Sequence, residues 1–432
     1  MKIRFLLFVL LASISSAQNS PNAKPSSVVL KATRLLDVRR GVYADNAAMW
    51  IEGERIKEVG TASEIAAHAP KDSRVIDLGR VTLLPGLIDC HTHIMARMPD
   101  TPNSYALDLA TKSQAVRALE GAYNARITLE AGYTTIRDVE NEGSGYADVA
   151  LRDAINQGLA VGPRMQVATR AIAAVGQYNP FGVSPDLQNF PTGAQMVSGV
   201  EEARRAVREQ IGHGADLIKV YADWSEPTLT VDEIRVIVEE AHRHKRKVAA
   251  HATTPEGIKN AVTAGVDSIE HGHHINREDL EMMKAQGTFL VPTLGVIDDM
   301  FKAPDSGTHT PDEVKWAEQI LHDMQQEIQM AKSLGVKITA GFDAATPELQ
   351  GKNASELEAM TKRGLTPLEA IQAATVHAAE LLNWKDDVGV LEAGHYADII
   401  AVEGDPLTDI KTLQRVKFVM KGGAVVKNAS AQ

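Results

Sequence analysis

The sequence predicts an α/β protein: a (β/α)8 barrel of the TIM type with a small β-sandwich domain formed by both chain ends. Through the middle of the chain, short apolar runs alternate eight times with longer amphipathic stretches, which is the pattern of parallel strands covered by helices. Both ends instead carry short alternating runs separated by turn residues, which is typical of antiparallel strands. The 432 residues, 44% of them hydrophobic, are enough to build both parts.

The first residues have the layout of a secretory signal peptide. Two basic residues precede an apolar run from Phe5 to Ala12, and the small residues Ser15 and Ala17 follow two apart. A buried first strand and a membrane anchor are the alternatives, but the run is far shorter than the ~20 residues that a membrane-spanning helix needs. We therefore expect residues 1–17 to be cleaved and the protein to be exported, either to the periplasm or out of the cell.

Composition limits the partners. A formal net charge of −11 argues against nucleic acid or an anionic membrane surface as the main partner. No other segment is long and apolar enough to span a bilayer. The single cysteine, Cys90, leaves no internal disulfide, so the core must hold the exported protein together. Association into a homo-oligomer is compatible with the sequence and is not decided by it.

The domain boundaries follow from the change in pattern. Residues 18–82 and 386–432 are expected to form the two halves of the small β-domain, because neither half looks large enough to fold alone. Residues 83–385 are expected to form the barrel. Its eight buried strands are predicted at residues 83–89, 134–139, 164–169, 217–222, 247–252, 268–272, 289–294 and 337–342.

Helix signals lie between several of these runs. Capping boxes are predicted at Ser198 with Glu201, Thr230 with Glu233, Thr310 with Glu313 and Thr366 with Glu369, and first-turn prolines at Pro311 and Pro367. Terminating glycines are predicted at Gly132, Gly265, Gly287 and Gly335. The connections 170–197 and 295–310 lack periodicity, and we expect them to be functional loops near the site.

Polar residues end most of the predicted strands. In a barrel of this type the active site lies at the carboxyl ends of the strands. Histidines two residues apart in a strand point the same way, so His91 and His93 should face the barrel mouth together. The polar residues that end the strands are His91, His93, Lys219, Tyr221, His251, His271 and Asp343. A lone histidine there is more often structural, but imidazoles and a carboxylate from successive strands are the ligand set that suits Zn²⁺.

The motifs together resemble the amidohydrolase superfamily. They are "LLPGLIDCHTH", "DLIKVYAD", "AAHATT", "SIEHGHH", "TAGFDAAT" and "VGVLEAGHYADIIAVEGDPL". Within it the chain is similar to the binuclear-zinc Xaa-Pro dipeptidase and carboxypeptidase branch, which is related to imidazolonepropionases. The resemblance covers nearly the whole mature chain.

The resemblance implies a role for each strand-end residue. His91 and His93 would bind a buried metal, and His251 and His271 a more exposed one. Lys219 would be carboxylated by CO2 and bridge the two metals, a pair of Zn²⁺ ions, while Asp343 would bind a metal and act as the base. The chemistry is consistent, because an ammonium facing a dication is repelled whereas a carbamate is attracted. A bridged hydroxide would then attack the carbonyl, with Asp343 taking and returning the proton. The alternatives are an ion pair for Lys219 and a helix cap for Asp343.

The substrate residues are harder to predict. Tyr221 can donate to a substrate carboxylate or to the oxyanion, and the family associates the corresponding tyrosine with substrate binding. Arg170 can pair with a carboxylate or remain in solvent. Many relatives carry a Gly-Gly-His in the loop after the third strand, where this chain has Gln177 and Tyr178. The contact of that histidine is therefore not carried over.

Other polar residues have open roles. Aromatic residues in the same loop, Phe181 and Phe190 among them, favour an apolar side chain in the substrate. Asp138 and Glu140 either support the site from behind or start a helix. His273 and His274 are expected not to bind metal, and Cys90 is expected to pack in the core.

The leading hypothesis is a metal-dependent hydrolase that cleaves an amide bond next to a free carboxylate, in a dipeptide such as Xaa-Pro or in an N-acyl amino acid. Hydrolysis of a cyclic amide or an imidazolone-type ring is the alternative. A deaminase is less favoured, because deaminases of this superfamily typically use one metal and lack the bridging lysine. A scaffold that has lost its metals would lack ligands, whereas all six positions are filled here.

Overall fold

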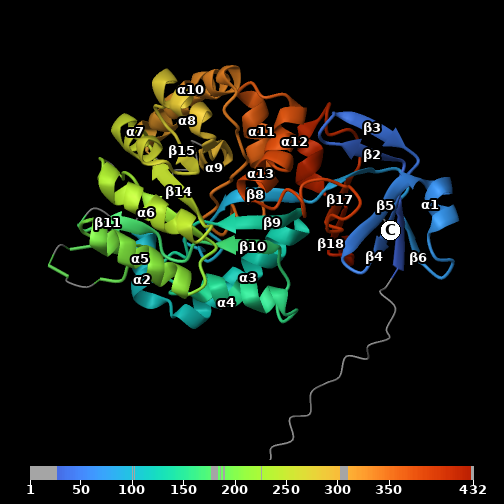
Figure 1. Cartoon of the computed structure of the whole chain (residues 1–432), viewed down its shortest axis with the longest axis horizontal. Helices are drawn as coiled ribbons and strands as arrows, with labels where there is room; N and C mark the ends of the chain where they lie inside the picture. Colours follow the sequence, from blue (N-terminus) through green and yellow to red (C-terminus); the bar gives the residue numbers. More distant parts are fainter. Residues whose placement is uncertain are drawn as a thin grey trace, which may run out of the picture.

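A computed structural model describes residues 27–429 except 100, 102, 177–182, 185, 188, 189, 225 and 302–309. The predicted signal peptide lies outside the described residues, as do the loop residues Gln177, Tyr178 and Phe181. Figure 1 shows the blue N-terminal and red C-terminal strands side by side at one end of the molecule, with the helices of the central region at the other.

Seven of the eight predicted central strands are present and pair in parallel. They are β8 (Leu87–Thr92), β9 (Tyr133–Asp138), β10 (Arg164–Val167), β13 (Leu217–Tyr221), β14 (Lys247–Ala252), β15 (Ser268–His271) and β16 (Phe289–Val291). β8 pairs with β9 and β9 with β10, while β13 to β16 pair in sequence order. The amide of Asp216, just before β13, donates to the carbonyl of Val167 in β10 and joins the two series.

The eighth predicted strand, 337–342, is not a regular strand. It forms an isolated parallel bridge from Ile338 to Leu290 in β16, after which the Cys90 amide in β8 donates to the carbonyl of Ala340. The segment changes partner within three residues, so neither ladder is long enough to count as a strand. The backbone hydrogen bonds nevertheless complete a circuit from β8 around to β16 and back, which is an arrangement of the TIM-barrel type.

The first predicted strand was placed too early. β7 (Thr82–Pro85) pairs antiparallel with β17 (Ile399–Val402) in the small domain, and β8 begins only after Gly86. A Cβ atom at Gly86 would overlap the side chain of Thr134. Glycine therefore lets the chain leave one sheet and enter the next at a point where β9 lies close by.

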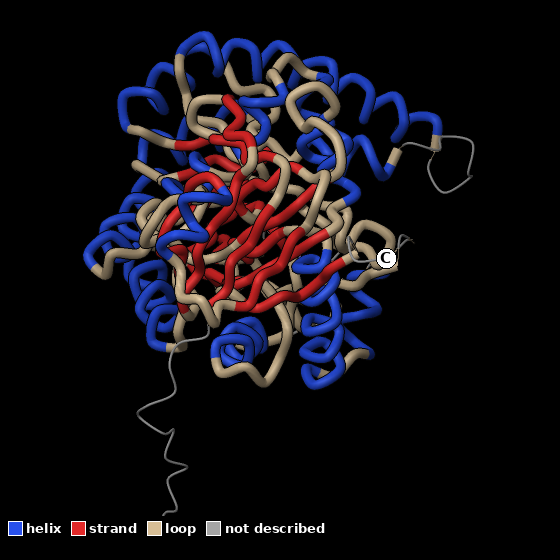
Figure 2. The backbone as a smooth tube through the Cα atoms, turned by 90° about the vertical axis from the view of Figure 1, so that its right-hand side faces the viewer, coloured by secondary structure: helices blue, strands red, loops and turns tan. Residues whose placement is uncertain are grey.

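The helices lie around the strands (Figure 2). They are α1 (Ala62–His68), α2 (Ser104–Thr111), α3 (Gln114–Glu130), α4 (Ala147–Asn156), α5 (Val200–Gly212), α6 (Val231–Arg243), α7 (Pro255–Ala264), α8 (Arg277–Gln286), α9 (Leu294–Met300), α10 (Pro311–Leu334), α11 (Ser355–Lys362), α12 (Pro367–Ala373), α13 (Val376–Leu381) and the 3-10 helix η2 (Ile410–Arg415).

Most of the predicted helix signals are confirmed. Thr230, Thr310 and Thr366 form capping boxes, and Gly265, Gly287 and Gly335 end their helices in the left-handed conformation. The box predicted at Ser198 with Glu201 is wrong, because α5 starts one residue later from Gly199, and the Ser198 amide donates to Glu202 instead.

Strands from both chain ends pair in one sheet in the region of the predicted small β-domain. One sheet has the order β5-β4-β1-β6, and the other has the order β19-β18-β17-β7-β2-β3. The remaining bounds are β1 (Ser27–Lys31), β2 (Arg34–Asp37), β3 (Val42–Asp45), β4 (Ala47–Glu52), β5 (Arg55–Thr61), β6 (Arg74–Asp77), β18 (Phe418–Lys421) and β19 (Ala424–Asn428). Leu30, Met49, Leu83, Ile399 and Phe418 belong to one apolar cluster, so the two sheets share a core. The exact domain boundaries remain a prediction.

The connection 170–197 is more ordered at its ends than expected. β11 (Ile172–Ala174) and β12 (Gln195–Val197) pair in parallel, and Ile172 also pairs with Val220 of β13. The start of the second connection, 295–310, belongs to α9. Within the part of the chain that the structure describes, no helix is both long and apolar enough to cross a membrane.

Candidate active site

The strand ends bring three of the predicted metal-binding residues into direct contact range. One donor atom from each of His91, His271 and Asp343 lies within 4.8 Å of the others. His93 joins them, because its Nε2 lies 3.2 Å from His91 Nε2 and 3.1 Å from Asp343 Oδ1. The spacing of two in β8 therefore aims both imidazoles at one point, as the strand period requires.

The other three residues lie beside this group. The ring of His251, from β14, lies 4.5 Å from the ring of His271 and 5.0 Å from that of Tyr221. Lys219 Nζ lies 5.7 Å from the centre of the Tyr221 ring. Lys219 is 1% exposed, although lysine is almost never fully buried without a partner. The structure thus brings all the predicted metal residues and Tyr221 to one end of the strands.

Three residues at or near the site have an unusual backbone conformation. His271, Thr293 and Asp343 have φ values of 69°, 49° and 64°, in the left-handed region that non-glycine residues rarely adopt. Each follows or ends a strand, and the change of direction turns its side chain out of the regular alternation. Gly341 has no side chain because a Cβ there would lie 2.6 Å from the Cβ of His91. The eighth segment can therefore pass directly beside β8.

Buried carboxylates lie behind the histidines of β8. Glu270 Oε2 lies 2.8 Å from His91 Nδ1, and its other oxygen accepts from Arg137 Nη2 at 2.8 Å. Glu142 Oε1 lies 2.8 Å from His93 Nδ1. The Glu270 carboxylate holds the proton of His91 on Nδ1 and leaves Nε2 with a lone pair, while Glu142 forms an ion pair with His93. Both Nε2 atoms lie on the side of Asp343.

Burial sets the charge of these groups. It lowers the pKa of His91 to about 4, with the charge of Lys219 adding to the effect, and lowers the pKa values of His251 and His271 well below their ordinary range. Burial alone would raise the pKa of Asp343, but His91 and His93 lower it to about 2. At neutral pH the imidazoles of His91, His251 and His271 are therefore neutral, and Asp343 is an ionised carboxylate.

This donor set fits a divalent cation. Neutral imidazole and carboxylate are the forms that bind Zn²⁺ and similar ions, and they need no proton removed first. Burial also lowers the pKa of Lys219, which favours the neutral amine that reacts with CO2. His93 differs, because Glu142 and Asp343 outweigh burial and raise the pKa of His93 well above its ordinary value. A cation bound at Nε2 would replace that proton.

Tyr221 contacts Glu140, whose role the sequence did not decide. Its hydroxyl donates to Glu140 Oε2 at 2.5 Å, and both side chains are buried. Asp138 accepts from the Ile94 amide and from Thr92 Oγ1, and so holds the chain directly after β8. Both acids support the site from behind, and neither starts a helix.

The remaining predicted residues lie further from the cluster or outside the described residues. Arg170 donates to the carbonyl of Ala194 and so fastens the long connection to itself, while its role toward substrate stays a prediction. The ring of His273 lies 6.0 Å from that of His271, and His274 is exposed. Cys90 is completely buried among apolar side chains, as predicted. Burial raises the pKa of its thiol to about 12.

The sequence analysis missed Glu270, Arg137, Glu142 and Thr293. Thr293 Oγ1 lies 2.8 Å from His271 Nδ1 and orients that ring. Glu270 and Arg137 could have been found from the sequence, because each interrupts an otherwise apolar strand. Two opposite charges in buried strands are stable only when they form an ion pair. Glu142 and Thr293 lie in connections, where no periodic pattern points to a partner.

Comparison with known proteins decides the family. The model of the amidohydrolase family matches residues 82–426, most of the chain and all of the strand-end residues described above. The chain belongs to the amidohydrolase family. It is a hydrolase that acts on C–N bonds of the amide type.

Several relatives of this amidohydrolase are known. It is 34% identical over 416 residues to ochratoxinase of Aspergillus niger, covering 88% of this chain and 83% of the relative. It is similar to a solved Xaa-Pro dipeptidase with methionine bound in the active site, with 31% identity, a TM-score of 0.82 and coverage of 93% and 99%. Imidazolonepropionase of Brevibacillus brevis is 22% identical over 422 residues, covering 88% and 90%.

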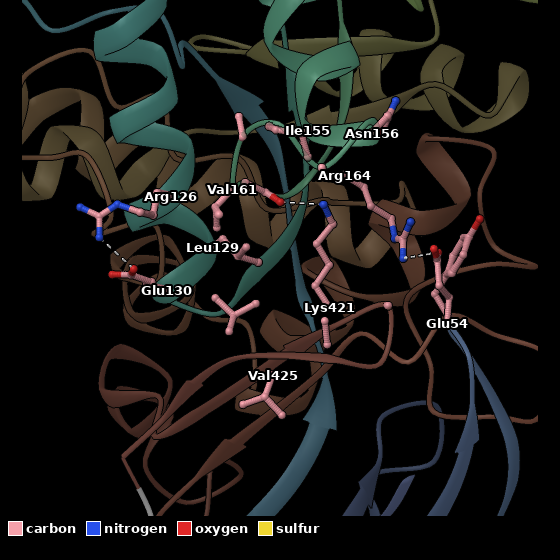
Figure 3. Close-up of a pocket in the computed structure, with 17 residues that line it drawn as sticks. Glu54, Arg126, Leu129, Glu130, Ile155, Asn156, Val161, Arg164, Lys421 and Val425 are labelled. Carbon is pink, nitrogen blue, oxygen red and sulfur yellow. Dashed lines mark hydrogen bonds and ion pairs between the residues drawn. The ribbon is translucent and has the colours of Figure 1, made fainter. Parts of the chain in front are cut away.

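A separate cavity of about 830 Å³ lies between the central region and the small domain (Figure 3). Its lining includes Arg164 at the start of β10 and Lys421 at the end of β18, so it is at the amino ends of the strands. Lys421 Nζ donates to the Gly162 carbonyl, and Arg164 pairs with Asp398. In barrels of this type the amino end serves stability, and the paired charges here fit that role.

Proposed function

We propose that this amidohydrolase is an exported, binuclear metal enzyme that cleaves an amide bond next to a free carboxylate. One observation carries the proposal: the side chains of His91, His93, His251, His271, Lys219 and Asp343 come from the ends of four strands and of the eighth segment, and they meet at the carboxyl ends. Members of this family are typically metal-dependent. No described residue outside this group offers a comparable set of donors.

The residues divide into two metal sites. His91 and His93 would hold the first ion with Asp343, and His251 and His271 the second, with a carboxylated Lys219 between the two. When bound, divalent ions such as Zn²⁺ polarise the substrate carbonyl and lower the pKa of a water molecule. This assignment uses every strand-end histidine in contact with the cluster and leaves His273 and His274 out.

Side chains of the protein would then transfer the proton of the attacking water. Asp343 is ionised at neutral pH, so it can accept a proton from the attacking water and later donate it to the leaving amine nitrogen. Glu270 and Glu142 keep the β8 histidines in one orientation while charge changes in the site. Tyr221 lies next to His251 and is the residue we assign to the substrate; because its hydroxyl hydrogen goes to Glu140, its oxygen would accept from an N–H of the substrate.

The relatives guide the choice of substrate. A Xaa-Pro dipeptidase structure and ochratoxinase are both about 30% identical to this chain over most of its length, and both names describe hydrolases. We infer a dipeptide, such as Xaa-Pro, or an N-acyl amino acid. A cyclic amide or imidazolone-type ring is the second candidate, favoured by the similarity to imidazolonepropionase.

Chromatographic screening of the zinc-loaded protein tests the proposal. The panel contains Xaa-Pro and other dipeptides, N-acyl amino acids, the same molecules with the carboxylate amidated, and cyclic amides. We expect a free amino acid to appear from members of the first two groups, and little product from the amidated controls. Cleavage of cyclic amides alone would support the second candidate, and equal cleavage of amidated and free substrates would contradict the carboxylate requirement.

Export is proposed from the first 17 residues alone. Expression of the full chain with its native start, followed by cell fractionation and N-terminal sequencing, tests it. We expect mature protein that begins near Gln18 outside the cytoplasm. Retention of Met1 in a cytoplasmic fraction would contradict export and leave the catalytic proposal unaffected.

A further inference from the structure

Tyr221 lies at the edge of the proposed metal centre. It ends β13, its ring is 5.0 Å from the ring of His251, and its side chain is almost completely buried. A phenol hydroxyl in such a place acts on a substrate only if its position and direction are fixed. The group that fixes them should lie within hydrogen-bond distance.

Glu140 is that group. Tyr221 Oη lies 2.5 Å from Glu140 Oε2, so the hydroxyl of a β13 residue reaches across to the chain that follows β9. Glu140 is 0% exposed, and among the described residues no donor reaches its second oxygen, Oε1. A buried carboxyl oxygen without a donor costs about 1–3 kcal/mol of folding stability.

The long connection closes over Glu140. A Cβ atom at Gly193 would overlap Glu140 Oε1 and would lie 2.7 Å from Tyr105 Oη, and the Gly193 amide donates to the same Tyr105 oxygen at 3.1 Å. A side chain at this position would therefore have to displace the Glu140 carboxyl group or the Tyr105 hydroxyl. Gly193, in the returning half of the 170–197 connection, therefore lies close against the carboxyl group that accepts from Tyr221.

We propose that Glu140 is a positioning residue: it accepts the single hydroxyl hydrogen of Tyr221, fixes the phenol, and leaves the Tyr221 oxygen free to accept a hydrogen bond from the substrate, while Gly193 lies against the Glu140 carboxyl group. This inference rests on the proposed function for the role of Tyr221, and on the structure alone for the contact. The 170–197 connection would then influence the reaction through Glu140 and Tyr221, without any of its own side chains contacting the substrate. Glu140 would act only through Tyr221.

A double-mutant cycle tests the proposal on the full-length, zinc-loaded enzyme with its best amide substrate. Glu140→Met keeps the volume of the side chain and removes the acceptor, while Glu140→Gln keeps an acceptor oxygen. We expect kcat/KM to fall about tenfold in Glu140→Met and in Tyr221→Phe, the loss of one well-placed hydrogen bond, and to fall no further in the double variant. Glu140→Gln should retain most of the activity.

Gly193→Ala provides the second arm. It should lower kcat/KM several-fold in the wild-type background and leave it unchanged in the Tyr221→Phe background. Gly212→Ala is the matched control, because a Cβ there meets no atom within 4 Å, and its activity should equal that of the wild type. Zinc content is measured in every variant and should not change, since a loss of metal would assign the effect to the ligands.

Equal losses from Glu140→Met in the two backgrounds would overturn the proposal, because Glu140 would then act independently of Tyr221. A cycle in the free energy of unfolding, for the same four proteins, separates this result from failure of the proposed function. If the wild type cleaves no amide in the panel, the proposed function and the catalytic role of Tyr221 fail together. Additive unfolding energies would then show that Glu140 does not hold the phenol at all.

Discussion

Replacing Glu270 by glutamine should destabilise the folded protein and weaken metal binding at His91. The carboxylate is 0% exposed and joins His91 to Arg137, which is 2% exposed. Glu270→Gln leaves the Arg137 guanidinium buried without a counter-charge. The same change replaces the ionised acceptor at His91 Nδ1 with a neutral amide.

The structure gives the size of both effects. Removing one partner of a buried ion pair costs about 3–5 kcal/mol of unfolding free energy, since the other charge remains desolvated. Arg137 keeps its bonds to Ser268 Oγ and to the Cys90 carbonyl, which places the expected loss at the lower end, about 3 kcal/mol. Loss of a carboxylate behind a metal-binding histidine weakens metal affinity by about 10–100-fold.

The assay measures denaturation of the chelated protein and zinc affinity in parallel for Glu270→Gln, Arg137→Met and the double variant. The double variant contains neither buried charge. Its loss of unfolding free energy should be smaller than the sum of the two single losses by about 1–3 kcal/mol. Its zinc affinity should nevertheless stay as low as that of Glu270→Gln, because His91 lacks the carboxylate in both. Additive losses of stability, or a zinc affinity unchanged by Glu270→Gln, would refute the reasoning.

Three further predictions address separate parts of the molecule. Asp343→Asn keeps the metal-binding histidines, so it should still bind zinc, although more weakly, and the zinc-loaded variant should lose turnover by at least about 100-fold, as expected for a base. Full activity would end that assignment. Burial, together with the charge of Arg164, lowers the pKa of Lys421 in the folded protein from 10.5 to about 8. Between pH 8 and pH 10.5 the unfolded chain therefore binds more protons at Lys421 than the folded protein does, so the free energy of unfolding rises with pH. Denaturation curves of Lys421→Met should lack this rise, and parallel pH dependence in the two proteins would contradict it. Gly86→Ala should cost about 1–3 kcal/mol in thermal unfolding by overlap with Thr134, whereas Gly212→Ala should cost much less; equal losses would remove the steric explanation.

The strand ends could be predicted from the sequence because they combine two strong local signals. An apolar run identifies a buried strand, and the polar residue that follows it lies at the carboxyl end. His91 and His93 needed only the strand period of two to be aimed at the same point. The helix caps at Thr230, Thr310 and Thr366 are equally local, since each box involves residues three apart.

Other features depend on partners that are distant in sequence. Strict alternation would send Glu270 and His271 to opposite faces, yet both reach His91, because His271 has a φ of 69°. The alternation of apolar and polar residues does not predict that a residue at a strand end has a left-handed backbone conformation. The apolar run of the eighth segment predicts a strand for the same reason, since it does not reveal that the backbone hydrogen bonds of the segment pass from β16 to β8 within a few residues.

The substrate residues were the least predictable part of the site. Arg170 looked available from its place after a strand, but its guanidinium lies on the carbonyl of Ala194. Glu140 could be assigned to a supporting role, but its partner could not, because Tyr221 lies 81 residues further along the chain. A side chain on a connection takes its direction from tertiary contacts rather than from spacing.

Zinc titration of chelated protein tests the central claim most directly. Hydrolysis of the best amide substrate is followed as zinc is added in known equivalents, with CO2 present, for the wild type and for Lys219→Ala. Two metals bridged by a carboxylated Lys219 predict that wild-type activity reaches its plateau at about two zinc ions per chain, and that Lys219→Ala stays nearly inactive. Full activity without added metal, or a plateau at one ion with Lys219→Ala equally active, would contradict the account.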